Sequence, residues 1–273
     1  MDLKSDTQFP ASSDRTEEEN PPKVSCLIVT ADRRALLRRS IRSWSRQTYS
    51  NRELVVVDNG KDTVEDLLED LPGDQVQYER IDPDGDLVLG DLRNISLDQA
   101  TGDFLMCWDD DDWFHPDRIS VQLESLGEEY DACCLLGNLF HINTPQLTDH
   151  PYRGYLPDGS PSSIIHRRDP EIRYPSLPRQ EDTVYLNKWR ERRYRKLPLS
   201  YSYLFVRCFH GDNVSGRKHF LRRLRNSPMG WIRYMWFHYV KGDVLQHPKF
   251  RLTEKERASI EMFQKDSRQL GLF

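Results

Sequence analysis

The sequence has no long apolar run. Its first residues carry no apolar signal core, and no later stretch approaches the roughly 20 consecutive apolar residues of a membrane-spanning helix. We therefore expect a cytoplasmic protein that is soluble or is attached, at most, to the surface of a membrane.

Cysteine is scarce, and the cysteines show no paired spacing. The five cysteines lie mainly inside apolar runs, and no two of them form a CxxC pair. This spacing excludes a small secreted scaffold held together by disulfides, because such scaffolds are dense in cysteine. We expect reduced thiols in the core of a cytosolic protein.

An excess of positive charge is missing as well. The formal net charge is -5, with 39 Lys and Arg against 44 Asp and Glu, which excludes a broad basic surface and predicts no nucleic-acid partner. A chain of 273 residues can bury one substantial core. We expect a disordered, acidic leader at 1–22, a catalytic domain at 23–215 and a C-terminal extension at 216–273 that packs on it.

Short apolar runs alternate with helical patterns in the first half of the chain. Val24–Thr30 reads as a buried strand, and Leu37, Ile41 and Trp44 follow it at helical spacing. Further strands are expected at 53–58, 76–80 and 104–108, and further helices at 64–69, at 90–100 and after Pro116. This order predicts a Rossmann-like α/β fold with a doubly wound, mostly parallel sheet.

The second half of the chain has a less regular pattern. Strands are expected at 132–138 and 206–211, and a helix at 182–190. The stretch 143–180 is rich in proline, arginine and aromatic residues and predicts no regular element.

Carboxylates stand where two of the expected strands end. Asp58 closes one strand, and four consecutive aspartates at 109–112 follow another. Ligands of open parallel sheets bind beyond the carboxyl ends of the strands, and a Mg²⁺ or Mn²⁺ ion is a common link between carboxylates and a nucleotide diphosphate. Four adjacent aspartates also repel one another, and no basic residue is next to them in sequence, so a cation is the simplest relief. The alternative is a solvated acidic loop.

Several segments resemble the family 2 glycosyltransferases, which are inverting enzymes of the GT-A fold. The resemblance covers roughly 23–215. It rests on the opening strand and helix, on Glu53-Leu-Val-Val-Val-Asp-Asn-Gly60 and above all on the segment from Leu92 through the aspartates to Trp113. It implies transfer of a sugar from a nucleotide-sugar donor, with a UDP-sugar favoured, to a hydroxyl of a glycan or lipid-linked glycan.

The resemblance also assigns donor and metal residues. Thr30 and Asp58 would line the nucleobase pocket, and Arg93 would lie near the phosphates or the sugar of the donor. Asp109 and Asp111 would be the two ends of the family's Asp-x-Asp element. Asp109 would lie near the ribose or the sugar of the donor, and Asp110 would also contact the donor. Asp111 would ligate Mn²⁺ or Mg²⁺.

Two further residues are implied downstream. Asp182, in the sequence Gln180-Glu-Asp-Thr183, matches the family's catalytic base, which would take the proton of the acceptor hydroxyl. The alternative for this residue is an acidic helix start without a catalytic role. His210 would be a third metal ligand or a donor to a phosphate oxygen, and a structural histidine is the alternative.

Segment 217–241 combines seven Arg and Lys residues with six aromatic residues and has no acidic residue. Such a segment could contact a membrane surface, or its aromatic residues could pack on the catalytic domain. Pro228 and Gly230 should interrupt a long amphipathic helix, which favours packing.

Two other functions fit part of the pattern. A sugar-1-phosphate nucleotidyltransferase shares the acidic metal site, but the segment after the first strand has no glycine. A non-catalytic nucleotide- or glycan-binding module of the same fold would keep Asp58 and Asp111 without needing Asp182. Turnover of the donor distinguishes this module from an enzyme.

Overall fold

The computed structural model describes residues 21–144, 147–209, 222–225 and 227–272. Nearly all of the expected leader, His210 and part of segment 217–241 lie outside the described residues. The first strand begins at Val24, one residue after the expected start of the fold.

The described residues form strands and helices in alternation. The strands are β1 (Val24–Thr30), β2 (Arg52–Asp58), β3 (Val76–Arg80), β4 (Phe104–Cys107), β5 (Trp113–Phe114), β6 (Ala132–Leu135), β7 (Gly137–Ile142), β8 (Tyr152–Tyr155), β9 (Ile165–Arg167), β10 (Tyr194–Leu197) and β11 (Phe205–Phe209). The helices are α1 (Arg34–Ser45), α2 (Leu89–Gln99), α3 (Arg118–Leu126), α4 (Glu181–Arg190), α6 (Pro228–Met235) and α7 (Glu254–Gln269). A π-helical turn, η5 (Trp236–Val240), continues α6.

A large, mostly parallel sheet forms the centre of the molecule, as the sequence predicts. Its order is β10-β6-β9-β4-β1-β2-β3. The pairs β1 with β2, β1 with β4, β2 with β3 and β6 with β10 are parallel, whereas β9 is antiparallel to both of its neighbours. The parallel strands β4, β1 and β2 therefore end at the same edge.

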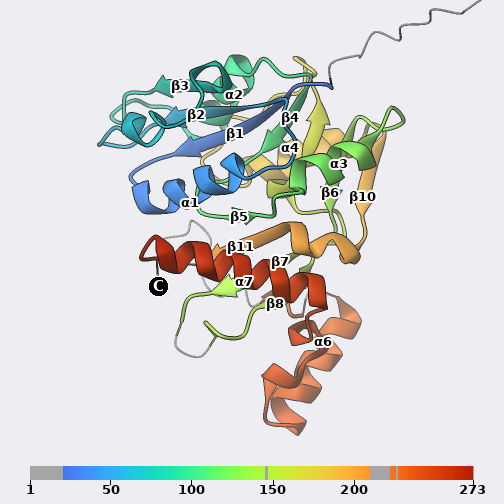
Figure 1. The fold of residues 1–273 in the computed structure, drawn as a ribbon. Helices are drawn as coiled ribbons and strands as arrows, with labels where there is room; N and C mark the ends of the chain where they lie inside the picture. The colour runs from blue at the N-terminus through green and yellow to red at the C-terminus, as the bar shows by residue number, and fades with distance from the viewer. Residues whose placement is uncertain (1–20, 145–146, 210–221, 226, 273) are drawn as a thin grey trace, which may run out of the picture.

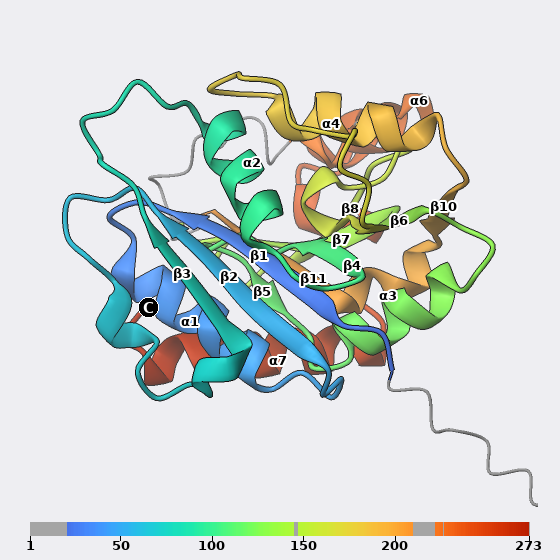
Figure 2. The ribbon, with the colours of Figure 1, turned by 90° about the horizontal axis from the view of Figure 1, so that it is seen from above.

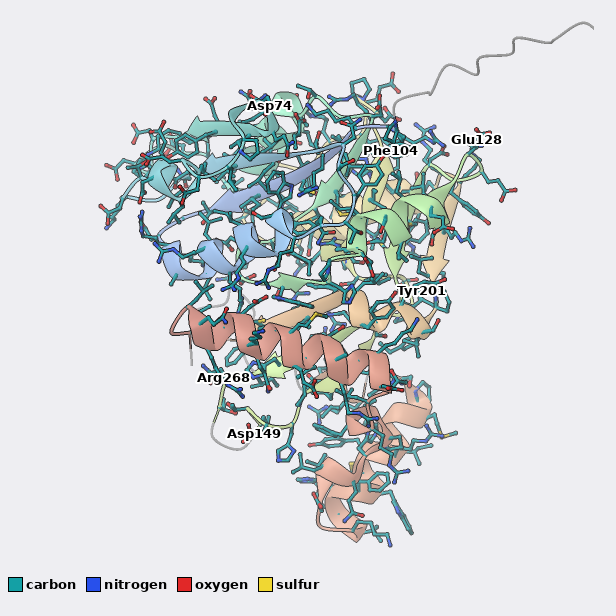
Figure 3. The ribbon with its side chains drawn as sticks, viewed as in Figure 1. Asp74, Phe104, Glu128, Asp149, Tyr201 and Arg268 are labelled. Atoms are coloured by element: carbon teal, nitrogen blue, oxygen red, sulfur yellow. The ribbon has the colours of Figure 1, made fainter. Side chains whose placement is uncertain are left out.

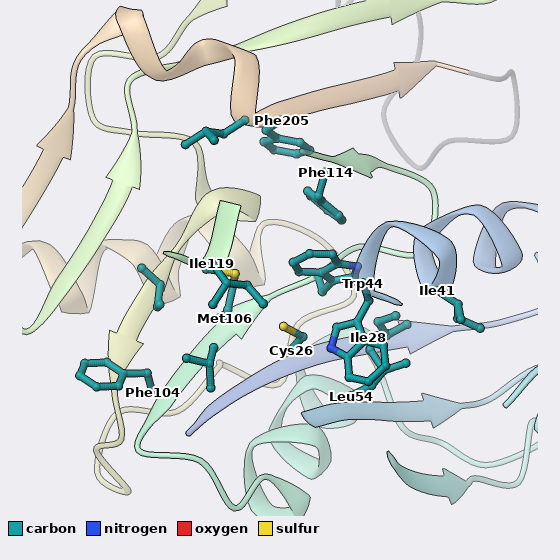
Figure 4. Packing of buried hydrophobic residues seen from close by; sticks show 14 of the residues in the cluster. Cys26, Ile28, Ile41, Trp44, Leu54, Phe104, Met106, Phe114, Ile119 and Phe205 are labelled. Carbon is teal, nitrogen blue, oxygen red and sulfur yellow. The ribbon is translucent and has the colours of Figure 1, made fainter. Parts of the chain in front are cut away.

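Helices cover both faces of this sheet (Figure 2). On one face, side chains of α1 and α3 pack on alternate residues of β1, with Trp44 and Ile119 in contact with the cluster that contains Cys26 (Figure 4). On the other face, α2 and α4 contribute Leu97 and Trp189. Burial on both faces explains why β1 and β2 read as continuous apolar runs. All five cysteines are buried free thiols, as expected.

A smaller sheet of order β5-β11-β7-β8 lies against α7 (Figure 1). Phe263 of α7 is fully buried among Trp113, Leu139 and Val206. The Asp266 carboxylate accepts a hydrogen bond from Trp113 Nε1 at 2.9 Å and pairs with Arg46 of α1. Figure 3 shows Asp74 at the top of the molecule, next to β3, and Arg268 in the lower half, on α7. The C-terminal helix thus forms part of the same hydrophobic core as the small sheet.

Two expected elements differ in the structure. The helix expected at 64–69 is only a three-residue 3₁₀ helix, Glu65–Leu67, in which the Leu67 and Leu68 amides donate to the carbonyls three residues earlier, at 3.0 and 2.9 Å. The strand expected at 132–138 is two strands, β6 and β7, which belong to different sheets. The chain changes sheet at Gly137, where a Cβ atom would lie 2.5 Å from a methyl group of Leu199.

The segment at 217–241 also differs from the favoured interpretation. Pro228 does not interrupt a helix but begins α6, where its missing N–H is harmless, and Ser227 accepts a hydrogen bond from the Gly230 amide as the N-cap. Trp231, Trp236 and other large apolar side chains of this helix are exposed, so the expectation that its aromatic residues pack on the catalytic domain is wrong for them. No helix within the described ranges is long and apolar enough to cross a bilayer.

Candidate active site

The carboxyl ends of β1, β2 and β4 bring the polar residues singled out in the sequence to one edge of the large sheet. Thr30 pairs with Asp58 in the β1–β2 register, and the aspartates at 109–112 follow the end of β4. Helix α1 holds their turn in place. Ser40 Oγ donates to the Asp109 carbonyl at 2.9 Å, and Arg39 donates to the Asp111 carbonyl at 2.6 Å.

Each of the four aspartates has a different partner. Asp109 Oδ1 accepts from Arg93 Nη2 at 3.1 Å, and Asp110 Oδ2 accepts from Thr30 Oγ1 at 2.7 Å. Arg33 contacts both Asp110, at 3.3 Å, and Asp111, at 3.4 Å. Asp112 has turned away from the others: its Oδ1 accepts from the Cys208 amide at 2.9 Å.

The arginines change the argument from charge repulsion. No basic residue is adjacent to the aspartates in sequence, but the fold places Arg33, Arg93 and Arg207 beside them. Burial alone would raise the pKa of Asp109, yet the charges of Arg93 and Arg207 outweigh it and lower that pKa. Part of the repulsion is therefore relieved by arginines of the protein itself, and repulsion does not by itself require a bound cation.

The pKa values of the two more deeply buried aspartates, Asp110 and Asp112, are raised instead. Burial, with the neighbouring charge of Asp111, raises the pKa of Asp110 to about 7. The same two causes raise the pKa of Asp112 well above its usual range. The Oδ2 atom of Asp112 is buried and has no hydrogen-bond partner among the described residues. Asp109 and Asp111, by contrast, are partly exposed and line the cleft.

A cleft of about 1300 Å³ opens at this edge of the sheet. Asp109, Asp110 and Asp111 line it on one side, and Asp182 lines it from the start of α4. A nucleotide sugar occupies a space of this order, since ligand pockets typically measure about 300–1,000 Å³ and the acceptor needs room as well.

Arg93 connects the two acidic sides of the cleft. Its Nε donates to Glu181 Oε1 at 3.1 Å, its Nη2 to Asp109 at 3.1 Å, and its guanidinium lies over the Tyr174 ring at 5.7 Å from the centroid. Burial raises the pKa of Glu181, although Arg93 opposes the rise. Glu181 is 3% exposed and anchors the helix, whereas the next residue, Asp182, is half-buried in the cleft. The Asp182 carboxylate accepts from the Thr183 amide at 2.6 Å.

Arginines also line the wall of this cleft. Arg207 extends from β11, and Arg222, Arg223 and Arg225 come from the segment before α6. Burial, together with the charges of Arg207 and Arg222, lowers the pKa of Arg223 to about 10. The wall thus holds several positive charges close together, which suits a ligand with negative charge.

The structure does not bring every expected residue to the cleft wall. Asp58 is fully buried, where it accepts from the Gly60 amide at 2.9 Å and Tyr78 Oη at 2.9 Å and pairs with Arg80 at 2.8 Å. Thr30 is 2% exposed and is bonded to Asp110. His210 lies outside the described residues, so its role as a ligand stays a prediction.

The donor atoms suit a hard cation that also binds phosphate. Within the part of the chain that the structure describes, no group of three or more His, Cys, Asp and Glu side chains is placed to hold a metal. Mg²⁺ in nucleotide sites commonly needs only one or two carboxylates, because water and phosphate oxygens supply the rest. Asp111, which lines the cleft, could supply such a carboxylate.

Sequence reasoning missed the arginines of the site. Arg33, Arg179, Arg207 and Arg223 line the cleft, and none was singled out as a site residue; Arg179 and Arg223 were considered only as parts of longer basic stretches. Arg33 stands three residues after β1, and Arg207 lies in β11. Their positions in or next to an expected strand could have indicated that both arginines lie near the site. Arg179 and Arg223 lie in irregular segments whose placement no pattern predicts.

Comparison with known proteins agrees with the geometry. The family model for glycosyl transferase family 2 matches residues 25–225. A putative glycosyltransferase, EpsH of Bacillus subtilis, is 30% identical over 111 residues, which are 40% of this chain and 32% of EpsH. The GalNAc(5)-diNAcBac-PP-undecaprenol beta-1,3-glucosyltransferase of Campylobacter jejuni is 29% identical over 117 residues, 40% of this chain and 36% of that protein. The chain spans about a third of the length of these curated relatives.

Solved structures share the fold at low sequence identity. Residues 1–349 of TarS from S. aureus, in complex with UDP, have a TM-score of 0.57 and 15% identity, over 91% of this chain and 80% of that one. The mannosyltransferase PcManGT from Pyrobaculum calidifontis, in complex with GDP-Man and Mn²⁺, has a TM-score of 0.54 and 13% identity, over 93% and 80%. The family model shows that the chain belongs to glycosyl transferase family 2, and the solved structures show that it has a GT-A fold.

Proposed function

We propose that this glycosyltransferase moves a sugar from a nucleotide-diphosphate sugar to an acceptor hydroxyl with inversion at the anomeric carbon. A UDP-sugar is the favoured donor, because TarS has been solved with UDP and with UDP-GlcNAc. The observation that carries the proposal is the cleft in which Asp109 and Asp111 lie on one wall and Asp182 on another.

In this proposal the acidic wall receives the donor. Asp111 would hold Mn²⁺ or Mg²⁺, with His210 as a further ligand, and Asp109 and Asp110 would lie at the ribose or the sugar. A divalent ion supplies neutralisation of the charge that develops on the departing diphosphate. PcManGT has been solved with Mn²⁺, which supports this choice of ion.

Arg93, Thr30 and Asp58 would serve the donor by positioning other groups. Arg93 fixes the Asp109 carboxylate beside the donor. Thr30 fixes Asp110. Asp58 holds the loop after β2 through the amides of Gly60 and Val64, and this loop would form the wall of the nucleobase pocket.

Asp182 would be the general base. An inverting transfer requires the acceptor oxygen to attack opposite the departing nucleotide, and one carboxylate on that side takes its proton. Asp182 is open to the cleft, and its neighbour Glu181 is held by Arg93, so the carboxylate is kept in position. The charges of Arg207 and Arg223 act on it as well.

The acceptor in this proposal is a hydroxyl of a glycan or of a lipid-linked glycan, and no nucleic acid takes part. We infer a cytoplasmic location, because five buried free thiols, two of them adjacent at Cys133 and Cys134, suit a reducing compartment.

Replacement of the base tests the proposal. Asp182→Asn should lower the rate of sugar transfer about 10²–10⁴-fold, the usual range for a general base, while the Kd of the donor nucleotide changes little. Asp158→Asn is the matched control, because Asp158 also lines the cleft but is exposed and pairs with Arg190. Equal loss of transfer in both variants, or a loss of nucleotide affinity as large as the loss of rate, would remove Asp182 from this role.

A further inference from the structure

The helix α6 and the turn η5 expose an unusual number of large apolar side chains. Six of the ten exposed large hydrophobic residues in the described part of the chain belong to this one segment, each of them 52–70% exposed: Met229, Trp231, Ile232, Trp236, Tyr239 and Val240. Figure 1 shows the helix at the end of the molecule farthest from β3. We call these six residues the α6 face.

The α6 face is continuous. Two rows of side chains, each spaced by four residues, run along one side of the helix. One row is Ile232, Trp236 and Val240, and the other is Trp231, Met235 and Tyr239. The two rows line one shallow apolar groove. A contiguous exposed apolar surface on a soluble domain marks a contact site in most cases.

Cations surround this surface. Arg225, Arg233 and Lys241 are exposed on the same segment, and 217–241 contains no acidic residue, although the chain as a whole has a net charge of -5. Aromatic side chains flanked by Arg and Lys are the pattern of a helix that lies in the interface of an anionic bilayer. A symmetric contact with a second copy would instead bring Arg225, Arg233 and Lys241 of both copies together, and like charges would oppose it.

The α6 face also adjoins the active-site cleft. Trp231 belongs to the apolar groove and lines the cleft as well, beside Ser227 and Pro228. Arg222 and Arg225 line the same part of the cleft. A molecule anchored in a lipid surface under α6 could therefore place a charged or polar head group among these arginines and extend its hydroxyl toward Asp182.

We propose that the α6 face docks on an anionic lipid surface and that the acceptor enters the cleft from this surface, which makes it a lipid-linked glycan. Only the entry of a lipid-linked acceptor into the cleft rests on the proposed function. The surface contact itself depends on the apolar rows and on the flanking cations.

Flotation with vesicles tests the contact. The full chain is mixed with vesicles of phosphatidylcholine alone, or of phosphatidylcholine and phosphatidylglycerol in equal parts, and binding is compared with that of Trp236→Ser/Tyr239→Ser. Neither residue lines the cleft, and both are exposed, so the variant should fold and should bind UDP as the parent does. The matched control is Leu87→Ser, an exposed leucine outside the face.

The parent and Leu87→Ser should float with the anionic vesicles, less so at high salt, whereas the double variant should lose about tenfold or more of its partition coefficient. Equal flotation of the double variant and the parent overturns the proposal. Failure of the parent to float with the anionic vesicles also overturns it. This includes the case in which the parent is a dimer that the double variant dissociates, because the α6 face would then contact a second copy. UDP affinity, measured on the same samples, reports on the proposed function separately.

Discussion

Arg93→Met is the substitution whose consequence follows most directly from the structure. The guanidinium is shared by Asp109 and Glu181, at 3.1 Å from each, and the side chains of these three residues are 12%, 16% and 4% exposed, respectively. Methionine keeps much of the volume of the side chain but removes its charge and its donors. The two carboxylates are then left close together without their common cation.

The expected loss of stability is large for a single substitution. Removing one partner of a buried ion pair costs about 3–5 kcal/mol, because the other charge stays desolvated. An exposed pair contributes only about 0–1 kcal/mol. Arg173→Met provides the control: Arg173 pairs with Asp98 on the same helix α2, and their side chains are 34% and 60% exposed.

Urea denaturation followed by circular dichroism measures both effects. We expect the free energy of unfolding to fall by about 3–5 kcal/mol in Arg93→Met and by less than about 1 kcal/mol in Arg173→Met. Adding Glu181→Gln to Arg93→Met should restore part of the loss, because one unpaired carboxylate is removed. Similar small losses in both single variants would refute the reasoning, since they would mean that Arg93 does not neutralise the two buried carboxylates.

Three further outcomes are expected. Asp111→Ala should weaken nucleotide binding in the presence of Mn²⁺ by at least about tenfold in calorimetric titration, and unchanged, chelator-insensitive binding would contradict its role as a ligand. Phe263→Ala should lower the free energy of unfolding by about 3–5 kcal/mol in the same urea assay, since the ring is fully buried; a loss below about 1 kcal/mol would separate α7 from the core. Glu53 is fully buried, and hydrogen bonds from Lys23, Ser25 and Thr101 outweigh the effect of burial and lower its pKa to about 2. Because the folded pKa is depressed, Glu53→Gln should cost about 3 kcal/mol at neutral pH, and the difference from the parent should shrink as the pH falls from about 4.5 toward 2; a difference independent of pH would contradict this.

Patterns in the sequence predicted the elements that are buried on two sides. β1, β2 and β4 read as apolar runs, and the spacing of Leu37, Ile41 and Trp44 predicted the buried side of α1, where all three side chains lie in the core. The same patterns placed Asp58 and the aspartates at 109–112 at the carboxyl ends of these strands, and the family resemblance added roles that stay predictions.

In the small sheet, the expected strand at 206–211 is confirmed as β11, but the sheet as a whole could not be predicted in the same way. β5 has two residues, and β8 has only four, Tyr-Arg-Gly-Tyr, so neither offers a hydrophobic period long enough to detect. Their pairing depends on contacts between positions far apart in the chain, such as Val206 with Leu139.

The arginines of the site were hidden for a related reason. Arg33 and Arg207 were not singled out, and Arg93 was assigned to the donor but not expected beside the aspartates. The three come from separate regions of the chain, and only folding brings them to the aspartates. The argument from repulsion considered neighbours in sequence and therefore overestimated the need for a cation.

Calorimetric titration of the folded protein with UDP, GDP and CMP, each with Mn²⁺ and then with EDTA, tests the central claim most directly. The account predicts that UDP binds in the presence of Mn²⁺ and that EDTA abolishes binding. Failure of all three nucleotides to bind a demonstrably folded sample would contradict it, and would mean that the cleft beside Asp109 and Asp111 is not a nucleotide-sugar site.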